Sequence, residues 1–199
     1  ERNTGGNDTP WVVHSTTWGA QTFTPVITHY IGSVKVHGYI VGTAGTMTVS
    51  IRAVDGSSQP TGPDLASGTT NANTITTSAS GEWREITFGT AYEITAGTKY
   101  AIVMRTTGAD VNNCFKWSIE TGSPTYPGGQ SEASTDSGSS WTGYDYDLDF
   151  AEYGHVAKSS IMKHHTNMGG NLQVYSTSAA NKAIQCIHHS SSSMYSNGR

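Results

Sequence analysis

The chain has 199 residues, of which 35% are hydrophobic and only 13% are charged. This length allows one domain with extra segments, or at most two small domains. The formal net charge of -4 and the absence of any basic run exclude the electrostatic footprint of a nucleic-acid-binding protein. No window approaches ~18 consecutive apolar residues, so we expect no membrane span.

The chain opens with a polar, turn-rich arm, residues 1–18, which carries a short apolar run of Trp11, Val12 and Val13. Such a run forms a strand either in the sheet of its own domain or in the sheet of a neighbouring subunit. We expect the first arrangement. The second stays open as a way for the arm to contact a neighbour.

Strands are predicted along most of the middle of the chain, because apolar and polar residues alternate with period two. Residues 45–55 show the plainest alternation, with Met47, Val49 and Ile51 on one side and mainly hydroxyl-bearing residues on the other. The predicted strands are residues 20–24, 32–41, 45–55, 81–88, 99–105, 114–119, 131–134 and 144–153. Strands at this spacing, without a helix signal, predict an all-β fold: a two-sheet antiparallel β-sandwich of jelly-roll type.

Three segments are assigned a place by their composition. Residues 99–105 are apolar on both faces and therefore belong in the middle of a sheet. Residues 131–134 are predicted to form a short edge strand. Residues 55–77 are dense in Gly, Pro, Ser and Thr, and we expect a long loop there.

The regular pattern weakens after Gly154, so the chain divides into an arm (1–18), a sandwich (19–154) and a C-terminal extension (155–199). The extension holds predicted strands at residues 171–175 and 183–188 and ends in a segment expected to be disordered. It cannot bury a core of its own. Its apolar residues, Leu172, Val174 and Ile184, are therefore candidate contacts with the sandwich or with another subunit.

The middle of the chain, from about Ala20 to Gly154, resembles a module without a settled name. This module recurs in predicted phage structural proteins and in surface proteins of environmental bacteria and archaea. The residues that carry the resemblance are Gln21–Pro25, Gly45–Ala53, Pro60–Thr69, Gly81–Ile86, Thr95–Val103 and Ser134–Thr142. The resemblance implies a jelly-roll-like sandwich at a virion surface or outside the cell, and no catalysis.

An acidic run, Asp145, Asp147 and Asp149, is the sharpest chemical feature of the sequence. Period two places the three carboxylates on one face of a strand, where they form either a solvated face or, with loop ligands, a calcium site. No other cofactor is expected. A glycosidase would need paired carboxylates across a cleft, and nothing in the sequence pairs the available ones. These are Glu82, Glu85, Glu120, Asp136 and Glu152.

Histidine and cysteine offer weaker signals. The pairs His164–His165 and His188–His189 are either exposed residues of the extension or, if the two pairs converge, metal ligands. Cys114 and Cys186 are either two unpaired thiols or a disulfide that ties the extension to the sandwich.

Five aromatic residues lie on or near the loops at one end of the predicted sandwich. They are Trp117, Tyr126, Trp141, Tyr144 and Tyr146. Rings of this kind either fill the core or form a surface on which sugar rings stack.

These signals predict a non-enzymatic structural or interaction subunit of a virion-surface or extracellular assembly. Its expected partners are other copies of itself or other surface subunits, which the arm and the extension would contact. The alternative is a carbohydrate-binding sandwich that uses the loop aromatics and is supported by calcium.

Overall fold

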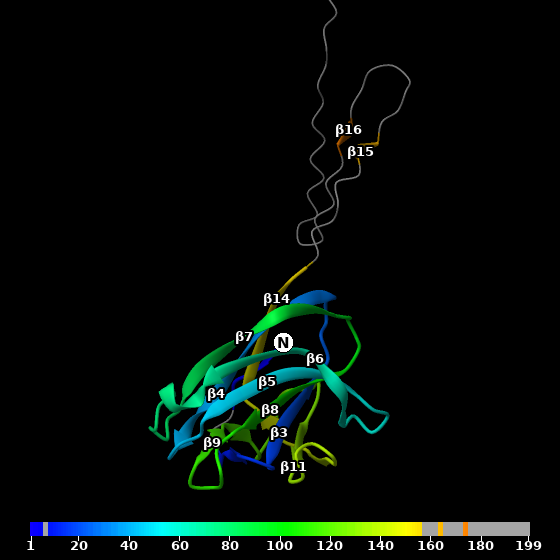
Figure 1. Ribbon diagram of the computed structural model, residues 1–199. Coiled ribbons are helices and arrows are strands. Elements are labelled where there is room, and N and C mark those ends of the chain that lie inside the picture. The colour runs from blue at the N-terminus through cyan, green and yellow to red at the C-terminus, as the bar shows by residue number, and fades with distance from the viewer. Residues whose placement is uncertain (6–7, 157–162, 165–172, 175–199) are drawn as a thin grey trace, which may run out of the picture. The chain divides into compact units, whose positions relative to one another are not determined.

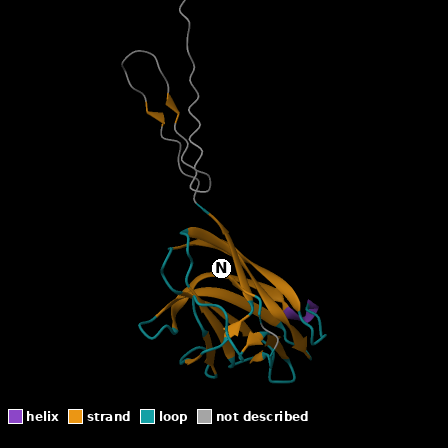
Figure 2. Ribbon diagram, turned by 180° about the vertical axis from the view of Figure 1, so that it is seen from behind, coloured by secondary structure: helices purple, strands orange, loops and turns teal. Residues whose placement is uncertain are grey.

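A computed structural model describes residues 1–5, 8–156, 163–164 and 173–174. The chain divides into two compact units, Glu1–Val156 and Ala157–Arg199. The first unit consists of antiparallel strands arranged in two main sheets (Figure 1), so the predicted all-β sandwich is confirmed. Apart from one three-residue turn of 3-10 helix, η1 (Ala72–Thr74), the elements in Figure 2 are strands and loops.

The first sheet has six strands, five of them in the order β1-β14-β4-β9-β2, with β7 also paired to β4. Its strands are β1 (Arg2–Asn3), β2 (Trp11–Val13), β4 (His29–Val41), β7 (Glu82–Ile94), β9 (Cys114–Trp117) and β14 (Phe150–His155). A short pair, β10 (Ile119–Glu120) with β13 (Asp147–Leu148), continues the chain beyond β9 and before β14.

The second sheet has the order β12-β11-β3-β8-β5-β6. Its strands are β3 (Trp18–Phe23), β5 (Thr46–Val54), β6 (Pro60–Asn71), β8 (Tyr100–Thr106), β11 (Ser131–Ser134) and β12 (Thr142–Tyr144). In the second unit, β15 (Lys163–His164) pairs with β16 (Gln173–Val174).

The core lies between the inner faces of the two sheets. Met47, Val49 and Ile51 of β5 are fully buried, as their alternation predicted. Strand β8 is central, paired with β3 on one side and β5 on the other, which explains why its residues are apolar on both faces. Trp117 and Phe150 are also fully buried in the core between the sheets.

The predicted loop at residues 55–77 is wrong, because most of it forms β6, which pairs with β5 on both sides of a register shift. The strand tolerates Pro60 and Pro63 because β6 is the outer strand of its sheet, where a missing N–H costs no ladder hydrogen bond. Its Gly68 lets β6 approach β7, since a Cβ there would collide with the carbonyl oxygen of Thr87. The predicted edge position of residues 131–134 is also wrong, because β11 lies between β3 and β12.

The predicted arm belongs to the sandwich. Strand β2 pairs with β9, and β1 pairs with β14, which is the own-sheet arrangement. Val13 is fully buried in the core and therefore cannot contact a neighbour, whereas Trp11 and Val12 are partly exposed. Of the candidate contacts in the extension, Val174 is in β16, and Leu172 and Ile184 lie outside the described residues.

Candidate functional site

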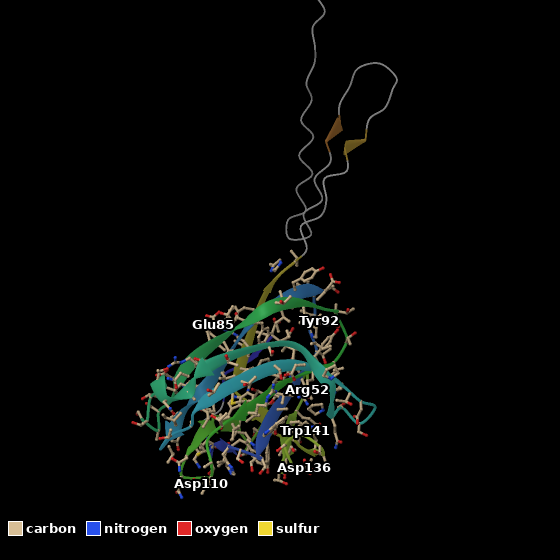
Figure 3. All side chains as sticks on the ribbon, viewed as in Figure 1. Arg52, Glu85, Tyr92, Asp110, Asp136 and Trp141 are labelled. Carbon is tan, nitrogen blue, oxygen red and sulfur yellow. The ribbon has the colours of Figure 1, made fainter. Side chains whose placement is uncertain are left out.

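Two of the predicted ligand residues, Trp117 and Trp141, are structural. Trp117 is fully buried in the main core, and its Nε1 donates a hydrogen bond of 2.8 Å to the carbonyl oxygen of Asp149. Trp141, labelled in Figure 3, is only 8% exposed and packs with Ala20 and Val103 on the outer face of the second sheet. Trp117 therefore fills the core between the sheets, and Trp141 is covered within a separate apolar cluster outside that core.

Tyr126 is partly buried beside a groove of about 770 Å³. Its ring meets Phe150 edge-on, with 5.2 Å between centroids, and its hydroxyl accepts a hydrogen bond from the backbone N–H of Thr24. Burial raises the pKa of this hydroxyl well above its ordinary value. Tyr126 therefore forms part of the groove wall as a neutral hydrogen-bonding group.

Tyr144 and Tyr146 lie side by side, and Trp11, a candidate contact with a neighbouring subunit, packs beside Tyr144. The two phenol rings stack with 5.7 Å between centroids and an angle of 11°. The ring of Trp11 lies 5.9 Å from Tyr144. We call Trp11, Tyr144 and Tyr146 the aromatic cluster.

Neighbouring strands hold the aromatic cluster in place. Ser131 of β11 is the register partner of Tyr144, and its N–H donates to the carbonyl oxygen of Tyr146 at 2.8 Å. Trp11 comes from β2 and lies over Gly19, where a Cβ would stand 2.9 Å from its ring. The contact of Trp11 with Tyr144 could not be predicted from the sequence, because Trp11 is far from both tyrosines along the chain.

The cluster combines an accessible ring with polar groups. Tyr144 is 37% exposed, Tyr146 is partly exposed, and the intervening Asp145 is exposed. The indole N–H of Trp11 is buried and has no hydrogen-bond partner among the described residues. Aromatic faces beside hydrogen-bonding groups are what a sugar ring can contact, since its C–H faces are apolar and its edge carries hydroxyls.

The acidic run does not form the predicted face of three carboxylates, because the strand is broken between β12, β13 and β14. Asp145 is exposed, but Asp147 and Asp149 are each 2% exposed. Asp147 accepts hydrogen bonds from Gln21 Nε2 at 3.2 Å and from the N–H of Tyr126 at 2.8 Å. The solvated-face alternative is therefore wrong for two of the three residues.

Asp149 has a different neighbour from Asp147: its Oδ2 lies 3.7 Å from Nδ1 of His37. Burial is the largest influence on Asp147 and raises its carboxyl pKa, and Glu120 and Asp145 nearby act in the same direction. Among the described residues, no group of three or more His, Cys, Asp or Glu side chains is placed to hold a metal ion. The predicted calcium site has no support from this geometry.

The carboxylates considered for glycosidase chemistry are each engaged by local partners. Glu82 pairs with Arg84 at 2.7 Å, and Glu85 accepts a hydrogen bond from Ser33 at 2.8 Å. Glu120, Asp136 and Glu152 are held by Thr125, Ser140 and His29, respectively. Each carboxylate thus has a hydrogen-bond or ion-pair partner in its own part of the sandwich.

A charged cluster on the outer face of the second sheet was not predicted. Asp64 of β6 accepts hydrogen bonds from Arg52 Nε at 2.7 Å and from a terminal nitrogen of Arg105 at 2.6 Å. Both guanidinium groups lie over the ring of Trp18, with 5.6 and 5.3 Å to its centroid. These four residues come from four adjacent strands, so their contacts fasten the strands of this face together.

Of the histidine and cysteine candidates, the described part of the chain includes Cys114 and His164. Cys114 is a buried free thiol whose Sγ donates to the carbonyl oxygen of Val111, and burial raises its pKa. Cys186 lies outside the described residues. His164 is in β15, and His165, His188 and His189 are likewise outside the described part of the chain.

No protein-family model matches the chain, and no curated protein matches it. The resemblance to a phage and surface-protein module therefore stays a prediction. In the described part of the chain, no helix is long and apolar enough to cross a membrane.

Proposed function

We propose that this protein is a non-enzymatic interaction subunit of a virion-surface or extracellular assembly, and that its sandwich binds carbohydrate. The observation that carries the carbohydrate part is the aromatic cluster. It places an exposed tyrosine ring against a second parallel ring and a tilted indole, at the junction of two sheets. The low charge of the chain suits a neutral ligand that is bound by stacking and hydrogen bonds.

In this proposal, the face of Tyr144 receives the apolar face of a sugar ring. The exposed carboxylate of Asp145 accepts hydrogen bonds from sugar hydroxyls, and the tyrosine hydroxyls donate or accept them. The contact uses Asp145 rather than Asp147, whose oxygens accept hydrogen bonds from Gln21 and from the N–H of Tyr126, and it includes no calcium ion. We therefore expect binding to persist in the presence of a chelator.

The test is a panel of polysaccharides and oligosaccharides titrated into the full-length protein and followed by tryptophan fluorescence and calorimetry. At least one glycan should bind, and Tyr144→Ala should weaken its binding by about tenfold or more. Tyr92→Ala is the matched control, since Tyr92 is 36% exposed on β7 and is not part of the aromatic cluster. A panel without any binding, or equal binding by both variants, would contradict the carbohydrate role.

A second surface of the sandwich supports the assembly part of the proposal, because exposed apolar side chains surround a groove there.

A further inference from the structure

A groove of about 770 Å³ is lined by segments of both sheets. From the first sheet come residues 1–5 and 151–153, which include β1 and part of β14. From the second sheet come Thr24, directly after β3, and residues 125–128, which precede β11. A volume of this size is in the range of ligand sites in proteins.

The lining of this groove offers hydrogen-bonding groups. The Tyr126 hydroxyl accepts a hydrogen bond of 3.3 Å from the N–H of Thr24, and its own proton has no acceptor among the described residues. Burial keeps the pKa of this hydroxyl high, so the proton stays in place at neutral pH. The hydroxyls of Thr24 and Thr125 donate to Gly128 and Glu120, which leaves both oxygens able to accept. The lining therefore provides one donor and two acceptors for the hydroxyls of a sugar.

Charges of both signs line the groove. They are the guanidinium of Arg2 and the side-chain carboxylates of Glu1 and Glu152. The side chain of Glu152 is 5% exposed, and its Oε2 lies 2.8 Å from Nε2 of His29. The more accessible charged groups are therefore one cation, Arg2, and one anion, Glu1. Such a pair favours neither an anionic nor a cationic ligand, but both groups can bond the hydroxyls of an uncharged one.

One hydrogen bond connects the wall of the groove to the aromatic cluster. The N–H of Tyr126 donates to Oδ2 of Asp147 at 2.8 Å. Asp147 directly follows Tyr146, whose ring stacks on that of Tyr144. The groove and the stacked rings therefore belong to neighbouring stretches of the sandwich, and a ligand longer than one sugar ring can reach both.

We propose that the groove continues the glycan-binding site, and that the ligand is an uncharged chain of sugars that occupies the aromatic cluster and the groove together. One ring of the chain stacks on Tyr144, and the hydroxyls of the following rings bond with Tyr126 and Thr125. A single terminal sugar would fill only the first of these places. This inference rests on the carbohydrate part of the proposed function and specifies its ligand as a stretch of an oligosaccharide or polysaccharide.

The first test compares ligands of increasing length. The probes are oligosaccharides of β-1,4-linked glucose, xylose, mannose and N-acetylglucosamine and of α-1,4-linked glucose. Each series runs from a single sugar to a hexasaccharide and is titrated calorimetrically into the full-length protein. In a series that binds, the hexasaccharide should bind about tenfold or more tightly than the disaccharide. One hexasaccharide should bind per protein molecule, since one chain occupies both places.

A double variant tests the groove itself. Thr125→Ala with Tyr126→Phe removes two hydroxyls and keeps the aromatic ring and the backbone. It should weaken hexasaccharide binding by about fivefold or more and leave disaccharide binding within about twofold of the wild type. Thr90→Ala with Tyr92→Phe is the matched control, because it removes the same atoms from exposed residues of β7 outside the groove and the aromatic cluster.

Two other lining residues, Val26 and Tyr153, stay unchanged in these variants. Both also line the second groove, so the surface that supports the assembly part of the proposal is left intact. Circular dichroism of each variant confirms that the sandwich is folded.

The outcomes separate this inference from the proposed function. Tyr144→Ala should weaken binding at every chain length, whereas the double variant should weaken only the binding of longer chains. Equal affinities for disaccharide and hexasaccharide would overturn the inference. Two hexasaccharides bound per protein, or a double variant that binds the hexasaccharide like its control, would overturn it as well. The carbohydrate role itself would stand in each of these cases, whereas no binding of any probe would overturn both.

Discussion

The ring of Trp11 lies 5.9 Å from the ring of Tyr144, and the two planes are tilted by 44°. Trp11 belongs to β2 of the first sheet and Tyr144 to β12 of the second. The contact therefore joins the two sheets at one margin of the sandwich. It also makes the aromatic cluster dependent on correct packing of the sheets, since neither sheet contains all of its rings.

Removal of the Trp11 ring should affect both stability and binding. We expect Trp11→Ala to lower the free energy of unfolding by roughly 2–3 kcal/mol, because a large, partly buried ring is lost. The same variant should lose glycan binding, since Tyr144 loses its neighbour. Urea unfolding and the glycan titration measure the two effects.

Trp83→Ala is the control for that variant, because Trp83 is 41% exposed on β7. Its effect on the free energy of unfolding should stay within about 1 kcal/mol. Equal stability of Trp11→Ala and the wild type would show that Trp11 does not join the sheets.

The meeting of β6 and β7 depends on the absence of a side chain at Gly68. We expect Gly68→Ala to cost about 1–3 kcal/mol, because its Cβ would meet the backbone at Thr87 and force the two strands apart. Gly89→Ala, also in a strand, has open space around its Cβ and should change stability by less than about 1 kcal/mol. Thermal and urea unfolding of the two variants measure this difference, and similar losses in both would contradict the close approach.

Asp64 should contribute stability that depends on pH. Burial acts to raise its pKa, but hydrogen bonds from Arg105 and Arg52 outweigh burial and leave the pKa below its ordinary value. Its contribution is therefore present above the pKa of about 3.9 in the unfolded chain, and it is lost as pH falls through the lower folded value. Asp64→Asn should cost about 1–2 kcal/mol at neutral pH.

The difference between Asp64→Asn and the wild type should shrink in acid. Urea unfolding at neutral pH and at successively lower pH values tests this, because the wild type loses the same interaction as Asp64 becomes protonated when the pH falls through its lowered folded pKa. A difference that is constant over this range would mean that Asp64 contributes through its shape rather than its charge.

The contribution of Glu132 to stability should depend on pH in the opposite sense to that of Asp64. It is 2% exposed on β11, its Oε2 has no hydrogen-bond partner among the described residues, and burial raises its pKa. An acid with a raised pKa in the folded state stabilises the fold below its unfolded pKa and loses that contribution as pH rises through the folded value. Glu132→Gln should therefore be more stable than the wild type at neutral pH, by on the order of 1 kcal/mol.

The extra stability of Glu132→Gln over the wild type should disappear at about pH 4, where Glu132 of the wild type is neutral. Thermal unfolding at the two pH values measures the change. A Glu132→Gln variant that is less stable than the wild type at neutral pH would show that the ionised carboxylate has a favourable partner.

Much of the fold could be predicted from the sequence, because the side-chain period of a strand is a local property. The alternation of Met47, Val49 and Ile51 identified the buried face of β5, and the doubly apolar run from Tyr100 onward identified β8 as central. The alternation within a strand can be recognised without knowing which strands pair with it. For this reason the all-β sandwich was predicted correctly without any structure.

Tertiary structure decided what local composition could not. The segment containing Pro60 and Gly68 looks like a loop, but it forms β6 because an outer strand can omit hydrogen bonds and because Gly68 fits against β7. The acidic run looks like one exposed face, but breaks in the strand bury Asp147 and Asp149 among separate partners. The period identifies which residues share a face only while the strand is continuous.

For the candidate surfaces too, some features could be predicted from the sequence and others depended on the tertiary structure. The sequence alone determined that the chain forms strands and that aromatic residues gather near Tyr144. Only the tertiary structure decided that Trp117 and Trp141 are buried, that Trp11 completes the aromatic cluster, and that Val26 comes to lie beside Val156. The physical reason is that these contacts join residues far apart in sequence, and their formation depends on strand register and sheet packing, which no local period encodes.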